Sequence, residues 1–250
     1  MMKEEIVLAG AGWLGKPLAL RLKEVGYSVR VIGRSPEKQA EFKSLGLAYQ
    51  VVDYEQLPKL KHEKLMICLP PCEHYLRIIQ NILNAVHPSF VLFTSSTSVY
   101  AQTAGSVNEN SVCEGNPLLV EAEKLILNGP PTGAVLRLGG LIGPERNPAK
   151  HFSGKSNLSN GLAPVNLIHQ SDILRFVELI LQQNLSGIHN VVHPFHPARK
   201  SYYEQECLAL GLDPCYFLPE GDGKVVDGSK ITRALNTEYL HPIVSQGRFG

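Results

Sequence analysis

Short apolar runs alternate with amphipathic stretches along most of the chain. Runs of strand length, closed by glycine, proline or polar residues, predict strands. Between several of them, apolar residues recur every three or four positions, which predicts helices. The expected strands are 6–9, 27–32, 48–53, 64–69, 90–93, 134–138 and 187–192, and the expected helices include 14–25, 36–45, 72–86 and 201–210. This alternation predicts an α/β fold of the Rossmann type, with a doubly wound parallel sheet.

The pattern changes near residue 193, where prolines and polar residues become frequent. We therefore expect a dinucleotide-binding Rossmann domain over 1–192 and a small C-terminal substrate lobe over 193–250. Residues 145–165 are expected to contribute to that lobe. At 250 residues the chain is long enough for such an arrangement.

Composition narrows the class of ligand. The 24 Lys and Arg residues nearly balance the 23 Asp and Glu residues, so there is no electrostatic footprint for nucleic acid or an anionic membrane surface. No apolar run approaches the roughly 18 residues of a membrane helix, and the chain enters its first strand almost at once, so a cytoplasmic location is expected. The five cysteines are expected to be free thiols. A small-molecule ligand is favoured.

Two groups of residues raise the question of a metal. Cys68 and Cys72 lie near His74, and His193 lies near His196. However, the first cysteine falls inside an apolar run, and the prolines beside both later histidines are more typical of a turn. We expect no metal.

The first apolar run leads into glycines at the spacing G-x-G-x-x-G, formed by Gly10, Gly12 and Gly15, with Trp13 and Leu14 between the last two. The first glycine permits a tight turn, the second lets the backbone approach a pyrophosphate, and the third lets helix and strand pack closely. The following helix presents free N–H groups and its positive dipole end to phosphates. These residues predict a dinucleotide site. The alternative is a structural turn lined by glycines.

The second strand ends in Gly33, Arg34 and Ser35, where an acidic residue would bind the ribose 2′-hydroxyl of NAD. The open space at Gly33, the positive charge of Arg34 and the hydroxyl of Ser35 suit the 2′-phosphate of NADP. We therefore favour NADP over NAD as the cofactor. The alternative is that Arg34 is a solvated loop residue. Asp53, which ends the third strand, is expected either to contact the adenine edge or to cap the next turn.

Two further strand ends complete the expected cofactor site. Leu69, Pro70 and Pro71 close the fourth strand, and ligands bind at the carboxyl ends of strands in a doubly wound sheet. These three residues are therefore expected to line the ribose or pyrophosphate. The fifth strand opens into five consecutive hydroxyl residues, Thr94–Ser98. A core would not accommodate such a row, so it predicts a polar site at the same edge.

With the glycine turn, this row resembles the T-S-S-T/S-x-V-Y stretch of extended short-chain dehydrogenases/reductases, in the sugar-nucleotide epimerase and dehydratase branch. The resemblance implies that Ser96 is the catalytic residue that hydrogen-bonds the substrate oxygen. It implies that Thr94 and Ser95 lie beside the nicotinamide. The segment 134–144 is similar to the exit of the family's sixth strand, with Ile142 in place of a tyrosine.

A second segment extends the resemblance. Residues 165–173 are similar to the family's "F-I-H-V-D-D" stretch, which docks the substrate lobe and begins a helix. Asp172 is expected to cap that helix. His169 is interpreted as a hydrogen-bonded structural residue rather than a catalytic one. The match spans nearly the whole chain and is similar to a small atypical subgroup with compact C-terminal lobes.

The sequence departs from the family at the acid–base pair. The family uses Y-x-x-x-K, in which lysine lowers the pKa of the tyrosine, and this chain contains no such pair. Depending on register, Val120 replaces the tyrosine and Lys124 is retained, or Gly115 and Leu119 replace the pair. Proton transfer is then expected from Lys124, from Tyr100 or through water.

Three functions remain open. The first is an NAD(P)-dependent oxidoreductase or epimerase-like enzyme with altered acid–base machinery, acting on a nucleotide sugar or a similar hydroxyl compound, as a monomer or homodimer. The second is a sensor or scaffold that holds NADP without turnover. The third rests on residues 15–19 and 67–70, which look like the β-hydroxyacid dehydrogenase family, but that family needs a long all-helical second domain.

Overall fold

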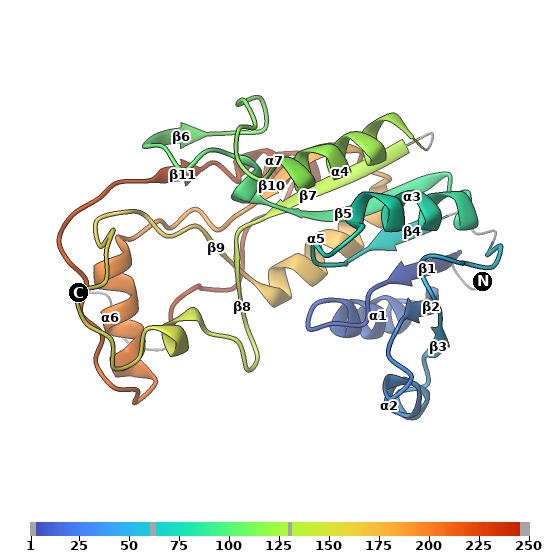
Figure 1. The fold of residues 1–250 in the computed structure, drawn as a ribbon, viewed down its shortest axis with the longest axis horizontal. Helices are drawn as coiled ribbons and strands as arrows, with labels where there is room; N and C mark the ends of the chain where they lie inside the picture. The colour runs from blue at the N-terminus through green and yellow to red at the C-terminus, as the bar shows by residue number, and fades with distance from the viewer. Residues whose placement is uncertain (1–3, 61–63, 130–131, 246–250) are drawn as a thin grey trace. The chain divides into compact units, whose positions relative to one another are not determined.

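The computed structural model in Figure 1 describes residues 4–60, 64–129 and 132–245. The strands of its main sheet are β1 (Glu5–Ala9), β2 (Ser28–Gly33), β3 (Ala48–Val51), β4 (Lys64–Ile67), β5 (Phe90–Ser96), β7 (Thr132–Leu138) and β10 (Gly187–Val191). They form a seven-stranded sheet in the order β10-β7-β5-β4-β1-β2-β3. The pairs β1–β2, β1–β4, β2–β3 and β4–β5 are all parallel. The predicted doubly wound α/β fold is confirmed.

Contacts divide the chain into two compact units. Unit 1 comprises Met1–Ser96, Asn116–Leu136 and Val177–Ile188, and unit 2 comprises Thr97–Gly115, Arg137–Phe176 and His189–Gly250. The sequence predicted a boundary after residue 192, with residues 145–165 joining the C-terminal lobe; unit 2 includes both of those stretches and also the segment Thr97–Gly115. The reason is that segments distant in sequence, such as those of Gly105 and Lys224, pair within unit 2.

The central strands of unit 1, β1, β4 and the first part of β5, are buried on both faces, which is why they read as continuous apolar runs, whereas the edge strand β3 has no buried residue. Helix α1 (Gly15–Glu24) packs on β1 and β2, α2 (Lys38–Ser44) lies against β3, and α3 (Tyr75–Val86) lies against α4 (Pro117–Asn128). Helix α4 packs on β5. It begins where Asn116 Oδ1 accepts hydrogen bonds from two backbone amides, with proline at the first helical position.

Unit 2 contains two short parallel pairs, β6 (Gly105–Val107) with β11 (Lys224–Val226) and β8 (Gly140–Ile142) with β9 (Leu167–His169). It also contains η1 (Thr97–Val99), η2 (Pro148–His151), α6 (Arg199–Ala209), α7 (Ser229–Leu235) and the start of α5 (Gln170–Gln183). The core of this unit gathers apolar residues from distant segments: Ile142, Ala149, Val165, Leu167, Tyr202, Tyr203, Cys207, Cys215, Phe217 and Ile243.

Two predictions at helix starts were wrong. Helix α3 begins at Tyr75 rather than near residue 72, because His74 adopts a left-handed backbone with φ of 59°. Helix α5 begins at Gln170, so Asp172 lies in its first turn and does not cap it. The carboxylate of Asp172 accepts hydrogen bonds from a distant segment instead, as described below.

Among the helices of the described ranges, none combines the length and apolar character needed to cross a membrane.

Candidate dinucleotide site and hydroxyl row

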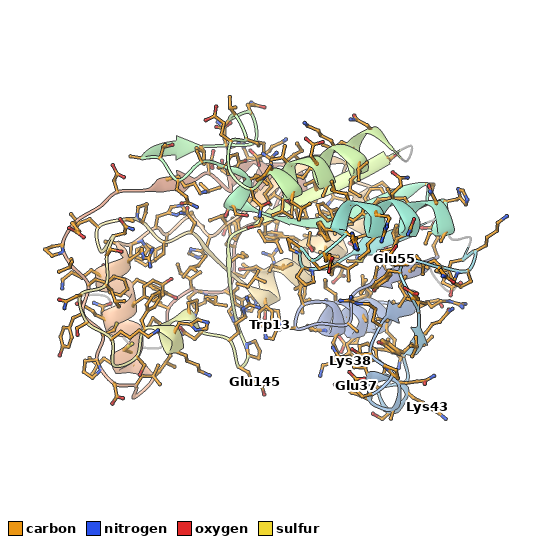
Figure 2. All side chains as sticks on the ribbon, viewed as in Figure 1. Trp13, Glu37, Lys38, Lys43, Glu55 and Glu145 are labelled. Carbon is orange, nitrogen blue, oxygen red and sulfur yellow. The ribbon has the colours of Figure 1, made fainter. Side chains whose placement is uncertain are left out.

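The glycine turn between β1 and α1 has the geometry that the motif requires. Gly10 has φ of 113°, in the left-handed region, and its amide donates to Ile32 O at 3.1 Å. A Cβ on Gly15 would lie 1.9 Å from Gly10 O, whereas a Cβ on Gly12 would meet nothing within 4 Å. The outer glycines are therefore needed for packing, and the middle one borders open space where a phosphate could approach. Figure 2 places Trp13 in this turn.

Two cations and one carboxylate follow the end of β2 within five residues. Arg34 is exposed, and Lys38, the first residue of α2, donates from Nζ to Ala11 O in the glycine turn at 2.7 Å. Hydrogen bonds from its own amide and from Ser35 lower the pKa of Glu37. Sequence reasoning missed both Lys38 and Glu37, although both follow the strand end closely; Figure 2 shows them at the start of α2.

Asp53 caps the turn that follows β3, one of its two expected roles. Its Oδ1 accepts from the amide of Glu55 at 2.9 Å. The next residue, Tyr54, is 3% exposed and donates to Ile32 O at 3.0 Å, and burial raises the pKa of its phenol. Contact between Asp53 and adenine stays a prediction.

The end of β4 lies beside the end of β5, as expected. The hydroxyl of Tyr75 donates to Leu69 O at 3.0 Å, which fixes the turn that also contains Pro70 and Pro71. Thr94 Oγ1 donates to Ile67 O at 3.3 Å. The residues expected to line the cofactor from β4 and β5 therefore occupy neighbouring strand ends of unit 1.

The hydroxyl row on β5 splits between the two faces of the strand. Ser95 is 5% exposed and donates from Oγ to Glu123 Oε1 at 2.6 Å, and that carboxylate, on α4, is 3% exposed. Because side chains alternate along a strand, half-buried Thr94 and Ser96 lie on the opposite face. The hydroxyl of Ser95 is thus committed to α4, and we retain only Thr94 and Ser96 in the candidate site.

Neither register of the missing acid–base pair supplies a proton donor. A Cβ on Gly115 would lie 2.1 Å from Ser98 O, so a side chain there would require a backbone shift. Lys124 has 59% of its side chain exposed and pairs with Glu121 at 2.7 Å. It lines a hollow shared with residues at the C-terminal ends of α3 and α4, among them His87. The structure therefore does not bring Lys124 to the carboxyl ends of the strands.

Tyr100, the other candidate donor, belongs to a buried network in unit 2. It is 0% exposed, donates to Asn190 Oδ1 at 2.8 Å and accepts from Arg137 Nη1 at 2.9 Å. Burial raises the pKa of its phenol, although the hydrogen bond from Arg137, the charge of that guanidinium and the hydrogen bond to Asn190 oppose the shift. These contacts identify a structural tyrosine.

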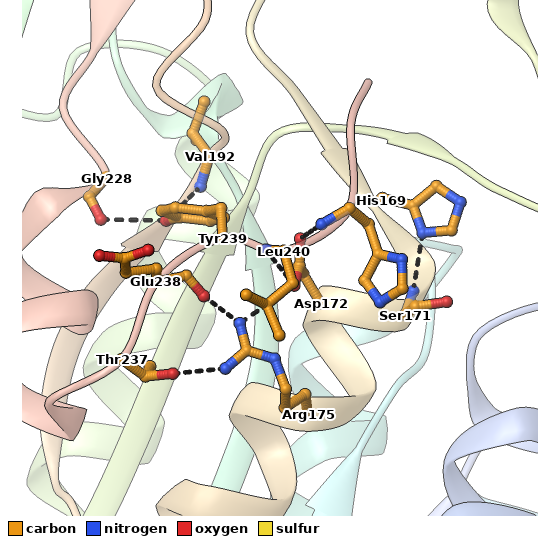
Figure 3. A network of polar contacts seen from close by, with 11 residues as sticks. His169, Ser171, Asp172, Arg175, Val192, Gly228, Thr237, Glu238, Tyr239 and Leu240 are labelled. Atoms are coloured by element: carbon orange, nitrogen blue, oxygen red, sulfur yellow. Dashed lines mark hydrogen bonds and ion pairs between the residues drawn. The ribbon is translucent and has the colours of Figure 1, made fainter. Parts of the chain in front are cut away.

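His169 and Asp172 lie in the network of Figure 3. His169 Nδ1 accepts from the amide of Ser171 at 3.2 Å, in agreement with its interpretation as a hydrogen-bonded residue. Asp172, 0% exposed, accepts from the amides of Leu240 and His241 at 3.1 and 3.0 Å. Within the described residues, no group of three or more His, Cys, Asp or Glu side chains is arranged to hold a metal ion.

Comparison with known proteins agrees with this geometry. Residues 5–114 match the family described as the NAD binding domain of 6-phosphogluconate dehydrogenase. Protein YeeZ of Escherichia coli strain K12 is 35% identical, over 96% of this chain and 97% of its own length.

Solved structures share the fold at lower identity. A functionally unknown conserved protein from Silicibacter pomeroyi is 18% identical with a TM-score of 0.82, covering 96% of this chain and 95% of its own. MoeE5 in complex with UDP-glucose and NAD is 17% identical with a TM-score of 0.77, covering 95% and 94%. UDP-glucuronic acid 4-epimerase from Bacillus cereus, in complex with NAD, is 17% identical with a TM-score of 0.76, covering 96% and 93%. The resemblance to the epimerase and dehydratase fold is thereby confirmed. Unit 2 contains β6, β8, β9 and β11, so it lacks the all-helical character that the β-hydroxyacid dehydrogenase hypothesis required.

Proposed function

Because the chain belongs to the same family as Protein YeeZ of Escherichia coli and has the fold of NAD-dependent epimerases, we propose that it is an NADP-dependent oxidoreductase or epimerase-like enzyme. Its substrate is a hydroxyl compound such as a nucleotide sugar. The observation that carries the proposal is that unit 1 combines an open backbone at Gly12 with half-buried hydroxyls of Thr94 and Ser96 at a nearby strand end.

Each group has a defined task in this proposal. The nicotinamide, when bound, supplies or accepts a hydride. The amides of the α1 N-terminus and the open edge at Gly12 hold the pyrophosphate. Ser96 hydrogen-bonds the substrate oxygen, and Thr94 helps to orient the ring. With Tyr100 buried and Lys124 on an outer face, the proton moves through water.

The choice of NADP over NAD rests on charge at the end of β2. Arg34 and Lys38 supply two cations where a 2′-phosphate would lie, against one carboxylate, Glu37. Arg34→Gln should weaken NADP binding about tenfold and leave NAD binding unchanged. Glu37→Gln should strengthen NADP binding. Lys43→Gln, an exposed change in the last turn of α2, serves as the control. Equal effects of Arg34→Gln on both coenzymes would contradict this choice.

The activity is tested by consumption of NADPH with a panel of nucleotide sugars, aldehydes and ketones. Ser96→Ala should abolish turnover while the dissociation constant for NADP stays unchanged. Ser106→Ala, at an exposed serine in β6, should retain full turnover. Turnover by Ser96→Ala equal to that of the wild type would refute the assignment.

A second candidate, a sensor or scaffold that binds NADP without turnover, is favoured by one observation. Neither Gly115 nor Val120 can donate a proton, and the structure supplies no replacement phenol from Tyr100. Tight binding of NADP by the wild type, with no NADPH consumption across the panel, would select this candidate.

A further inference from the structure

Unit 2 contains a pocket of about 370 Å³. Its apolar wall includes Ile142, Leu210, Ile243 and Val244, and its polar lining includes Glu145, Arg146, Lys150, His169 and His241. This volume suits a small organic molecule or one part of a larger molecule. An apolar wall with convergent cations is typical of a site for an organic anion.

The pocket is held in shape by two buried carboxylates. Glu206 is 2% exposed and accepts from Asn147 Nδ2 and from the amide and hydroxyl of Ser245, each at 2.7 Å. It thereby joins the loop that carries Arg146 and Lys150 to the tail segment. Asp172 holds the other end of that segment through the amides of Leu240 and His241 (Figure 3). These hydrogen bonds fix the loop and the tail segment before a ligand binds, which lowers the entropic cost of binding.

Arg146 is presented by a tight turn. Gly143 and Arg146 exchange backbone hydrogen bonds, both at 3.0 Å, and Glu145 between them has φ of 62°. A left-handed backbone at a non-glycine residue is strained and persists where the surroundings impose it. Both Arg146 and Lys150 are exposed at the rim, where they can meet an incoming anion.

The histidines provide a third source of positive charge. The rings of His169 and His241 stack with centroids 5.1 Å apart and planes inclined by 21°. Because Nδ1 of His169 accepts from the amide of Ser171, the neutral ring carries its proton on Nε2. Burial, and then the charge of His241, lower the pKa of His169, while Asp172 opposes the shift. The lowered pKa favours the neutral form of His169, and a bound anion would stabilise its imidazolium.

We propose that this pocket binds the phosphate of a small phosphorylated substrate through Arg146, Lys150 and the stacked pair His169 and His241. The proposal rests on the proposed function in taking the ligand as the substrate. We favour phosphate over carboxylate as the ligand group. The pocket provides two permanent cations and two imidazoles, which are more positive and hydrogen-bonding groups than a carboxylate ligand would use, even though Glu145 also lines it. The phosphate could belong to a sugar phosphate or to the diphosphate of a nucleotide sugar.

Isothermal titration of the full-length protein with glucose 1-phosphate and with UDP-glucose separates these two sources. Arg146→Gln and Lys150→Gln should each weaken binding of the preferred ligand about tenfold. Lys155→Gln removes one exposed positive charge of unit 2 outside the pocket lining and should change binding less than twofold. Absence of binding by both ligands would overturn the proposal, and so would equal weakening by all three variants.

The pH dependence provides a second readout. The diphosphate of UDP-glucose keeps its charge between pH 6 and 8, so its affinity should rise as the pH falls and His169 takes up a proton. His169→Asn should flatten this dependence at constant ionic strength. An unchanged profile in this variant would exclude the imidazole of His169 from the site.

The same preparations are titrated with NADP, which separates this inference from the proposed function. The pocket variants should bind NADP like the wild type, which also shows that they are folded. If the protein binds NADP but neither UDP-glucose nor glucose 1-phosphate, the phosphate pocket is refuted and the proposed function is not. If it binds either phosphate compound but not NADP, the proposed function is refuted and the phosphate pocket is not.

Discussion

Three glycines of the turn after β1 differ in what a methyl group would meet. At Gly15 it would overlap a backbone oxygen, and at Gly12 it would enter open space. The spacing of the motif predicts these different tasks. It could not predict the contact of Lys38 with the same turn, because that contact joins residues 27 positions apart in sequence.

We expect Gly15→Ala and Gly12→Ala to separate folding from binding. Gly15→Ala should lower the free energy of unfolding by about 1–3 kcal/mol, because the backbone must move to admit the new Cβ. Gly12→Ala should leave that free energy almost unchanged but weaken NADP binding at least about tenfold. Chemical denaturation and NADPH fluorescence titration measure the two quantities. The opposite pattern would show that the open space at Gly12 does not face the cofactor.

Ser95 tests the division of the hydroxyl row. Ser95→Ala leaves the buried carboxylate of Glu123 without a 2.6 Å hydrogen bond, so the free energy of unfolding should fall by about 1–3 kcal/mol. Exposed Ser106→Ala should change it by less than about 0.5 kcal/mol. If Ser95→Ala has no effect on stability but impairs NADP binding, the hydroxyl faces the cofactor and our division of the row is wrong.

Among the elements, the long buried strands could be predicted and the short ones could not. A strand such as β4 is buried throughout, and its continuous apolar run marks it in the sequence. Strands β6, β8, β9 and β11 have three residues each, too few to show a periodicity. Their partners are distant in sequence, as Gly105 and Lys224 illustrate.

The prediction that Asp172 caps α5 was wrong for the same reason, namely that its hydrogen-bond partners are distant in sequence. Asp172 looked like a helix cap because capping requires only local sequence. Its carboxylate instead accepts from the amides of Leu240 and His241 and pairs with Arg175, which also donates to Thr237 Oγ1 and to the carbonyl of Glu238. No local pattern reveals such a partner.

Asp172→Asn should loosen this attachment of the tail segment to α5. The amide has one acceptor oxygen instead of two, so the free energy of unfolding should fall by about 1.5–3 kcal/mol. Hydrogen exchange at the amides of Leu240 and His241 should accelerate. The amide of Val226, which donates to Asn166 in the same unit, should exchange as in the wild type. Unchanged exchange at residues 240 and 241 would contradict the attachment.

At the scale of the whole molecule, histidines should set the stability in mildly acidic solution. Burial is the first cause that lowers the pKa of His169, His193 and His196, all in unit 2. The unfolded chain, with histidines near 6.5, then binds more protons than the folded chain. Stability is therefore full above pH 6.5 and falls as the pH drops from there towards the folded pKa values.

This prediction is checked by urea denaturation at pH 8.0, 7.0, 6.0 and 5.5. Each histidine can contribute at most about 1.4 kcal/mol per pH unit. Replacing all three with glutamine should reduce the slope between pH 7 and 5.5, whereas His151→Gln, at an exposed position, should not. Carboxyl groups such as those of Glu37 and Asp227, with ordinary pKa values of 4.5 and 3.8, act at lower pH. A slope that survives the triple replacement would assign the effect to other groups.

The contacts of Asp172 and of the core of unit 2 also determine when this unit can finish folding during translation. The core that contains Ile142 also contains Ile243, and Asp172 accepts two of its hydrogen bonds from the backbone amides of Leu240 and His241. During translation these partners leave the ribosome about 70–100 residues after Ile142 and Asp172. Unit 2 therefore completes its packing only after residues 240–243 have been made, and a nascent chain that stalls before residue 240 leaves Asp172 with Arg175 but without the two backbone amides that also donate to it.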